Sequence, residues 1–128
     1  MGKKASISTQ TLSIVHDGQL TQEEALNALK IAAKSATEAL PAALAQCKTK
    51  GECYKVQADR DTVVLAYLTS LKKTLVNTSS LFEKIAVDLE KEAGNVRLKA
   101  TTLKNVSEAI SLCAGLVRLA SSLALAFA

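Results

Sequence analysis

The three cysteines are the residues of this chain whose type and spacing come closest to carrying chemistry. Cys47 and Cys53 flank a short polar stretch, and Cys113 stands far from both in an apolar segment. If the polar stretch is a turn between two helices, the sulfur atoms of Cys47 and Cys53 come within disulfide distance. A disulfide would indicate an oxidising compartment, secreted or periplasmic, whereas two reduced thiols are typical of the cytoplasm. The sequence leaves both states open, and it predicts a buried, inert thiol at Cys113.

No set of residues specifies a metal site, a cofactor or a reaction. Two cysteines separated by five residues supply only two ligands, at a spacing that zinc sites do not use. The one histidine, His16, stands beside Asp17 in a stretch with little periodicity, which cannot orient a catalytic triad. A di-metal bundle site needs further histidines on the helices. We therefore expect no enzymatic activity, no metal and no cofactor.

The composition favours a folded domain that does not bind nucleic acid. The chain has 128 residues, of which 48% are hydrophobic, and this suits one domain with one core. Only 3% are aromatic, so the core must be built from Ala, Leu, Val and Ile. The net charge is +4. The lysines are scattered and lack the interleaved aromatic side chains of a nucleic-acid face, so we expect no nucleic-acid partner.

Residues 1–19 differ in periodicity from the segment that follows. They carry only a partial alternation of apolar side chains and are expected to form an extended arm. Thr21 and Glu24 then form the pattern of a capping box. Apolar residues recur every three or four positions from there to Cys47, which predicts a helix. Pro41 removes a backbone donor inside this run, so we expect a kink there.

A second helix is predicted behind a polar turn at residues 48–52. It runs over residues 53–76, and its apolar face includes Leu68 and Leu71. The turn is short, so the first two helices should lie side by side and antiparallel.

A third helix opens with the pattern of a capping box at residues 80–83. Gly94 and Asn95 are expected to end it, and a fourth helix then spans residues 96–126. The apolar stripe continues past Gly94, so one long helix is the alternative. Together these elements predict an all-α fold, an antiparallel (up-down) four-helix bundle over residues 20–128, preceded by the arm. Roughly two thirds of the residues or more should be helical.

The C-terminal helix carries more apolar surface than a small bundle obviously needs. From Ala109 onward roughly two thirds of its circumference is apolar, whereas an ordinary bundle helix has a stripe a little over about 100° wide. We expect the surplus to be buried against another chain, with Arg118 at the rim of the contact. The residues expected in this interface are Leu116, Leu119, Leu123 and Phe127. The same segment is long enough to span a membrane, but Arg118 near its centre would cost about 3 kcal/mol there, so membrane association is not favoured.

The missing catalytic set and the surplus of apolar helix surface favour a function in binding. The sequence predicts a non-enzymatic helical bundle that acts through protein–protein interaction. It would be either a self-assembling structural unit, and then a homo-oligomer, or an inhibitor or adaptor of a partner protein. The alternative is a carrier of an apolar ligand or a lipid-associated protein, in which the bundle opens around the C-terminal helix.

Overall fold

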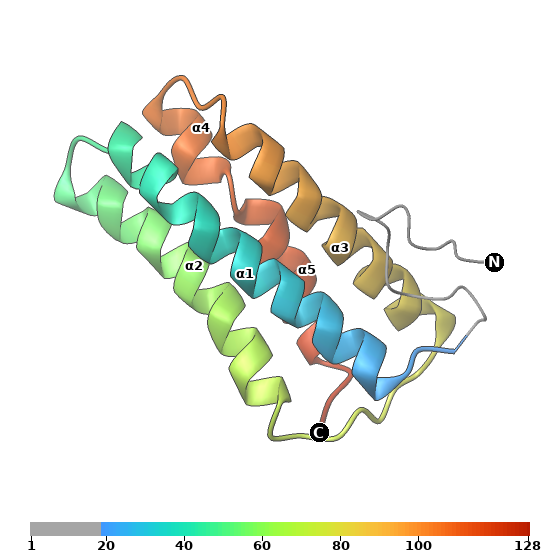
Figure 1. The fold of residues 1–128 in the computed structure, drawn as a ribbon. Helices are drawn as coiled ribbons and strands as arrows, with labels where there is room; N and C mark the ends of the chain where they lie inside the picture. Colours follow the sequence, from blue (N-terminus) through green and yellow to red (C-terminus); the bar gives the residue numbers. More distant parts are fainter. Residues whose placement is uncertain (1–18) are drawn as a thin grey trace.

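Five helices in four rods make up the computed structural model, which describes residues 19–128 (Figure 1). The helices are α1 (Gln22–Gln46), α2 (Lys50–Ser70), α3 (Ser80–Ala100), α4 (Val106–Ser111) and α5 (Ala114–Ala124). They hold 76% of the described residues, and α4 and α5 follow one another as the fourth rod. The predicted all-α four-helix bundle is confirmed. The predicted arm, apart from Gln19, lies outside the described residues, as does His16.

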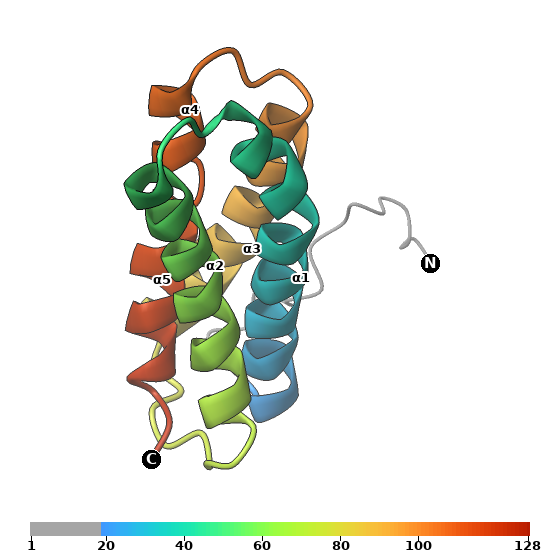
Figure 2. The ribbon, with the colours of Figure 1, turned by 90° about the vertical axis from the view of Figure 1, so that its left-hand side faces the viewer.

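The four rods alternate in direction, and α1 packs along both α2 and α3 (Figures 1 and 2). The fourth rod fills the remaining corner: α5 contacts α2 and α3, and both α4 and α5 touch α1 across the bundle. α2 and α3 stand at opposite corners, because the segment that connects them crosses the end of the bundle. α1 and α3 therefore lie side by side and run in the same direction.

Small side chains line the inner face of α1, the helix on which the others pack. Thr21 caps its start: the Thr21 hydroxyl accepts a hydrogen bond from the Glu24 N–H at 3.1 Å, and the Glu24 carboxylate accepts one from the Thr21 N–H at 3.0 Å. This confirms the predicted capping box. The helix continues through Pro41 to Gln46. Its buried residues are Ala25, Ala28, Leu29, Ala32, Ala33, Ser35, Ala36, Ala39 and Ala43.

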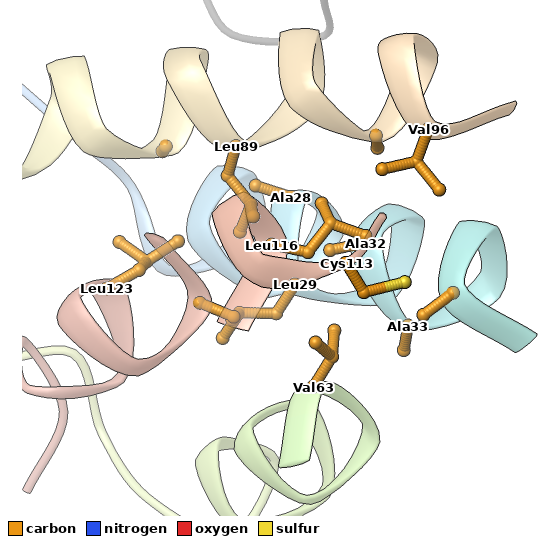
Figure 3. Packing of buried hydrophobic residues seen from close by; sticks show 14 of the residues in the cluster. Ala28, Leu29, Ala32, Ala33, Val63, Leu89, Val96, Cys113, Leu116 and Leu123 are labelled. Atoms are coloured by element: carbon orange, nitrogen blue, oxygen red, sulfur yellow. The ribbon is translucent and has the colours of Figure 1, made fainter. Parts of the chain in front are cut away.

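Branched side chains from the other helices fill the space that these alanines leave (Figure 3). Val63 of α2, Leu89 and Val96 of α3, and Leu116 and Leu123 of α5 are each fully buried. Figure 3 shows them converging with the alanines of α1 in one cluster. The core is therefore mainly aliphatic, as the composition indicates.

α2 differs from the predicted second helix at both ends. The sequence predicts a helix over residues 53–76, whereas α2 runs from Lys50 to Ser70. Its start is fixed by a capping box of Thr49 and Glu52, in which each residue satisfies a backbone N–H of the other. Leu75 and Val76 do not continue the helix, because their backbone pairs with the end of the chain.

Residues 71–79 cross the end of the bundle, first as a turn and from Thr74 onward as an extended segment. Thr74 and Ala128 exchange two backbone hydrogen bonds, at 3.0 and 2.9 Å, and Leu75 forms an antiparallel bridge with Phe127. The beginning of α1 contacts the same segment through further hydrogen bonds. The connection is thus hydrogen-bonded to both ends of the described chain. The spacing of apolar residues along the sequence does not predict such long-range pairing.

The boundary between the third and fourth rods lies later than predicted. α3 continues through Gly94 and ends at Ala100, so neither a break at that glycine nor one unbroken helix is correct. The turn of residues 101–105 separates the rods. The Asn105 side chain caps α4 by accepting a hydrogen bond from the Glu108 N–H at 2.9 Å.

Burial of the residues around Gly94 explains why α3 continues. Ala93 and Val96 are fully buried, and their packing outweighs the roughly 1 kcal/mol that a glycine costs a helix. At its start, α3 follows Ser79, whose side chain makes no cap hydrogen bond. The capping box predicted at residues 80–83 is therefore not formed.

The fourth rod, predicted as one helix, is interrupted at Leu112 and Cys113. Cys113 has φ −97° and ψ 8°, outside the α-helical region. In the first turn of α5, Gly115 lies against Glu92 of α3: a Cβ at this glycine would stand 2.7 Å from Glu92 Oε2. Glycine permits the approach without displacing the carboxylate, which lies close to the positive end of the α5 dipole.

The alanine face of α1 predicts that side-chain size limits what this helix tolerates. Ala32 is fully buried, so Ala32→Leu forces extra carbon atoms into a packed core. It should lower the free energy of unfolding by about 1–3 kcal/mol. Thr37→Leu, at an exposed position of the same helix, is the control and should change it by less than about 0.5 kcal/mol. Chemical denaturation followed by circular dichroism measures both, and equal stabilities would contradict the close packing.

Ser35 is the polar exception on this face. Its side chain is fully buried, and its hydroxyl has no hydrogen-bond partner among the described residues. An unpaired buried hydroxyl costs about 1–3 kcal/mol. Ser35→Ala keeps a small side chain and removes the hydroxyl, so it should raise the free energy of unfolding by about 1 kcal/mol in the same denaturation experiment. A loss of stability would show that the hydroxyl makes a stabilising bond.

Candidate interaction surface

The residues predicted to form an interface on the C-terminal helix lie mostly in the core of the chain itself. Leu116, Leu123 and Phe127 are 0%, 0% and 5% exposed. Leu116 and Leu123 are covered because α5 packs between α2 and α3 and reaches α1, and Phe127, beyond α5, bridges Leu75. These three side chains are therefore not available to another molecule. The predicted interface is therefore wrong for them. Leu119 is half-buried against the core, and Arg118 is exposed.

An exposed apolar stripe lies instead on the outer side of α2. Tyr54, Leu65 and Leu68 are 73%, 59% and 47% exposed. At about 3.6 residues per turn they point away from Val56 and Val63, which α2 buries against the bundle. α2 is thus apolar on two opposite faces, one inside the bundle and one outside it.

Charged residues share this outer stripe. From Asp61, steps of four, three and four residues lead to Leu65, Leu68 and Lys72, so all four lie in one narrow sector of the helix. The helical path extends to Lys72 because the C-cap Leu71 keeps helical backbone angles, φ −58° and ψ −27°. The Asp61 carboxylate is 66% exposed and pairs with the preceding arginine at 2.7 Å. Asp61, Leu65, Leu68 and Lys72 are called the outer face of α2 below.

The two apolar stripes explain an error in the sequence prediction. Leu68 and Leu71 are predicted to face the core, yet both are 47% exposed. A helix with apolar residues on opposite sides has two apolar stripes. The spacing of its residues therefore does not show which stripe faces the core. The buried side in fact carries two polar residues, Asp59 and Ser70.

Cys47 and Cys53 meet at the turn between α1 and α2. Both are free, partly exposed thiols, and they are close enough for Cys53 to affect the pKa of Cys47. The Cys47 thiol also donates a hydrogen bond to the carbonyl oxygen of Ala43 at 3.4 Å. Burial, followed by the effects of Cys53 and the Glu52 carboxylate, raises the pKa of Cys47. The predicted proximity is confirmed, and the disulfide itself stays a prediction.

Cys113 is buried where the fourth rod breaks, as the sequence predicts. Figure 3 shows its sulfur directed into the core, toward α1. Burial first, and then the negative charges of Asp59 and Glu92, raise the pKa of Cys113 from 9.0 to about 11. A thiol with this pKa stays protonated at neutral pH, so Cys113 is not a nucleophile.

The hollows among residues 19–128 do not gather a set of metal-ligating side chains. Across residues 19–128, no group of three or more His, Cys, Asp or Glu side chains could hold a metal ion. The interior void beside Cys113 has a volume of about 10 Å³, room for about one water molecule. A surface cleft of about 360 Å³ lies between α3 and α4, and Glu92, Lys99, Lys104 and Glu108 line it. Two acidic and two basic side chains in an open cleft specify no ligand.

The segment Val106–Ala124 is long and apolar enough to cross a membrane, judged by length and composition. It is the fourth rod of the bundle, and 33% of its apolar window is buried there. The core helix of a soluble bundle passes the same test, so this segment is weak support for a span. Membrane association stays a prediction that is not favoured.

Comparisons with protein-family models, with curated proteins and with solved structures each find no match to this chain. The fold therefore defines the class of protein, an all-α four-helix bundle, and the function has to be argued from its surface and its side chains.

The raised pKa of Cys113 predicts a change of stability at alkaline pH. The thiol ionises near pH 9.0 in the unfolded chain and near 11 in the folded chain, so between these values the unfolded state binds fewer protons. The free energy of unfolding should therefore fall as the pH rises from about 9 to about 11. Cys113→Ala lacks the group and should lose less stability over this range. If denaturation shows that the free energy of unfolding of both proteins falls equally over this range, the Cys113 thiol is not desolvated in the folded state.

Proposed function

We propose that this protein is a non-enzymatic helical bundle that acts through protein–protein interaction, and that the outer face of α2 binds a second copy of the chain. The observation that carries the proposal is the exposure of Leu65 and Leu68, 59% and 47%, within a regular helix. Complete burial of a leucine side chain contributes about 1.5–3 kcal/mol. Leucines on successive turns of one helix face are the kind of surface that a second helix packs against.

The charges beside the leucines favour a second copy as the occupant. Consider two α2 helices packed antiparallel, with a two-fold axis between Leu65 and Leu68. Each Leu65 then lies against Leu68 of the partner subunit. The same axis brings Asp61 opposite Lys72 of the partner subunit, because Asp61 precedes Leu65 by four residues and Lys72 follows Leu68 by four. The outer face of α2 is therefore complementary to itself in both apolar contacts and charge.

The size of this face indicates a weak dimer. Stable complexes bury about 800 Å² on each partner, and one helix face with two leucines supplies less. We therefore expect dimers that form and dissociate with protein concentration.

A carrier of an apolar ligand has less support. Ligand pockets measure about 300–1,000 Å³ and are lined mostly by apolar side chains. The void beside Cys113 holds about 10 Å³, and three larger hollows among residues 19–128, of about 360, 490 and 510 Å³, are open to solvent and lined in part by charged side chains.

Leu65→Glu combined with Leu68→Glu tests the proposed contact. Sedimentation velocity over about 5–500 µM should show the wild type shifting from monomer to dimer and the double variant staying monomeric. The circular dichroism spectrum should not change, because both side chains lie outside the core. Leu98→Glu is the matched control, since Leu98 is a leucine of α3 that is 72% exposed, and this variant should dimerise as the wild type does. A wild type that stays monomeric at every concentration overturns the proposal.

A charge exchange separates a second copy from any other partner. Asp61→Lys alone, or Lys72→Asp alone, places like charges opposite each other in the dimer and should weaken it by about 3- to 10-fold. The variant that carries both changes restores opposite charges across the two-fold axis and should regain most of the affinity. Failure of the double variant to recover would show that the partner of this face is not an antiparallel copy.

A further inference from the structure

Hydrogen bonds among its own residues fix the turn between α1 and α2, which has a cysteine at each end. Glu52 Oε1 accepts hydrogen bonds from the N–H groups of Lys48 and Thr49, at 2.7 and 3.1 Å, and the Thr49 hydroxyl accepts one from the Glu52 N–H at 3.1 Å. These bonds hold the end of α1 against the start of α2. Cys47 is the C-cap of α1 and Cys53 lies in the first turn of α2. Both thiols are partly exposed, and Cys53 lies close enough to contribute to the raised pKa of Cys47.

We propose that Cys47 and Cys53 form a redox-active dithiol. A low-molecular-weight disulfide, such as oxidised glutathione, converts it into an intramolecular disulfide that closes the α1–α2 turn. Cys113 takes no part, because it is buried in the core. The dithiol does not depend on the self-association proposed above, since both cysteines lie at the far end of α2 from Leu65 and Leu68.

The oxidation takes two exchange steps that balance with no other reactant. The Cys53 thiolate attacks one sulfur of the small disulfide; its S–S bond breaks, a mixed disulfide forms on Cys53 Sγ, and one small thiolate leaves and takes up a proton. Cys47 then gives up its proton to water and attacks Cys53 Sγ, which expels the second small thiol. The two protein thiols are oxidised, and the small disulfide is reduced to two thiols.

The order of attack follows from the surroundings of Cys47. Its thiol donates a hydrogen bond to the Ala43 carbonyl oxygen at 3.4 Å, and this bond holds the proton on sulfur. Burial, followed by the effects of Cys53 and Glu52, raises the pKa of Cys47, so little of it is thiolate at neutral pH. Cys53 is therefore the thiol that attacks first. Cys47 lies near Cys53 in the same turn, so its own attack is intramolecular and the mixed disulfide should not accumulate.

Glutathione redox buffers test the dithiol on the reduced, folded, full-length chain. Intact mass spectrometry and peptide mapping identify the products. The wild type should lose the mass of two hydrogen atoms, contain a disulfide between Cys47 and Cys53, and carry no glutathione. Dithiothreitol should reverse the change. Because the disulfide closes a short loop, it should raise the melting temperature by about 5 °C.

Single variants test the order of attack. Cys47→Ser should stop at a glutathione adduct on Cys53, and Cys53→Ser should form its adduct more slowly. Cys113→Ala is the matched control and should oxidise as the wild type does, and circular dichroism establishes that each variant is folded. The dithiol is overturned if the wild type keeps a stable glutathione adduct, oxidises only after denaturation, or melts at a lower temperature when oxidised. Faster adduct formation in Cys53→Ser than in Cys47→Ser overturns the order of attack.

Discussion

The rest of the bundle depends on the close packing of the other rods against the alanine face of α1. A methyl side chain fills little space, so neighbouring helices can approach the α1 backbone closely, and the volume of the core must come from their own side chains. Leu89 of α3 and Leu116 and Leu123 of α5 supply it. Ser35 fits the same close packing, because a serine is scarcely larger than the alanines around it.

This constraint also explains why α5 carries so much apolar surface. An alanine-rich helix leaves space along the bundle axis, and the helix at the opposite corner has to fill it while it also packs against its two neighbours. Leu116 and Leu123 are therefore core residues, and their large side chains fill the space beside the small side chains of α1. The bridge between Leu75 and Phe127 covers the end of the same rod. On α2, in contrast, Leu65 and Leu68 are exposed on successive turns of one face.

Sequence patterns were sufficient where a signal is local. The capping box of Thr21 and Glu24, and the helix that follows, depend on neighbours within a few residues, and the structure has both. The prediction that the third helix ends at Gly94 is wrong. A glycine weakens a helix, but the free energy gained by burying Ala93 and Val96 is larger. The connection at residues 71–79 could not be predicted, because its partners lie at the other end of the chain. Among the candidate site residues, the closeness of Cys47 and Cys53 could be predicted from the short turn between α1 and α2. The exposed side of α2 could not be predicted, because it depends on how the neighbouring helices pack.

The two ends of the bundle are held by different kinds of bond, and this separates the two proposed roles of α2. The end crossed by residues 71–79 is held by backbone hydrogen bonds among three parts of the chain. At the opposite end, the capping box of the α1–α2 turn and a side-chain bond from Gln46 Nε2 to the Leu103 carbonyl oxygen, at 3.4 Å, make the local contacts. Cys53 lies at this second end, and the outer face of α2 lies toward the first. Between Cys53 and the outer face, α2 is held against the bundle by its buried residues Val56 and Val63. A disulfide in this turn would therefore stabilise the end of the bundle that has fewer backbone bonds, and it would leave the proposed packing of Leu65 and Leu68 against a second copy unchanged.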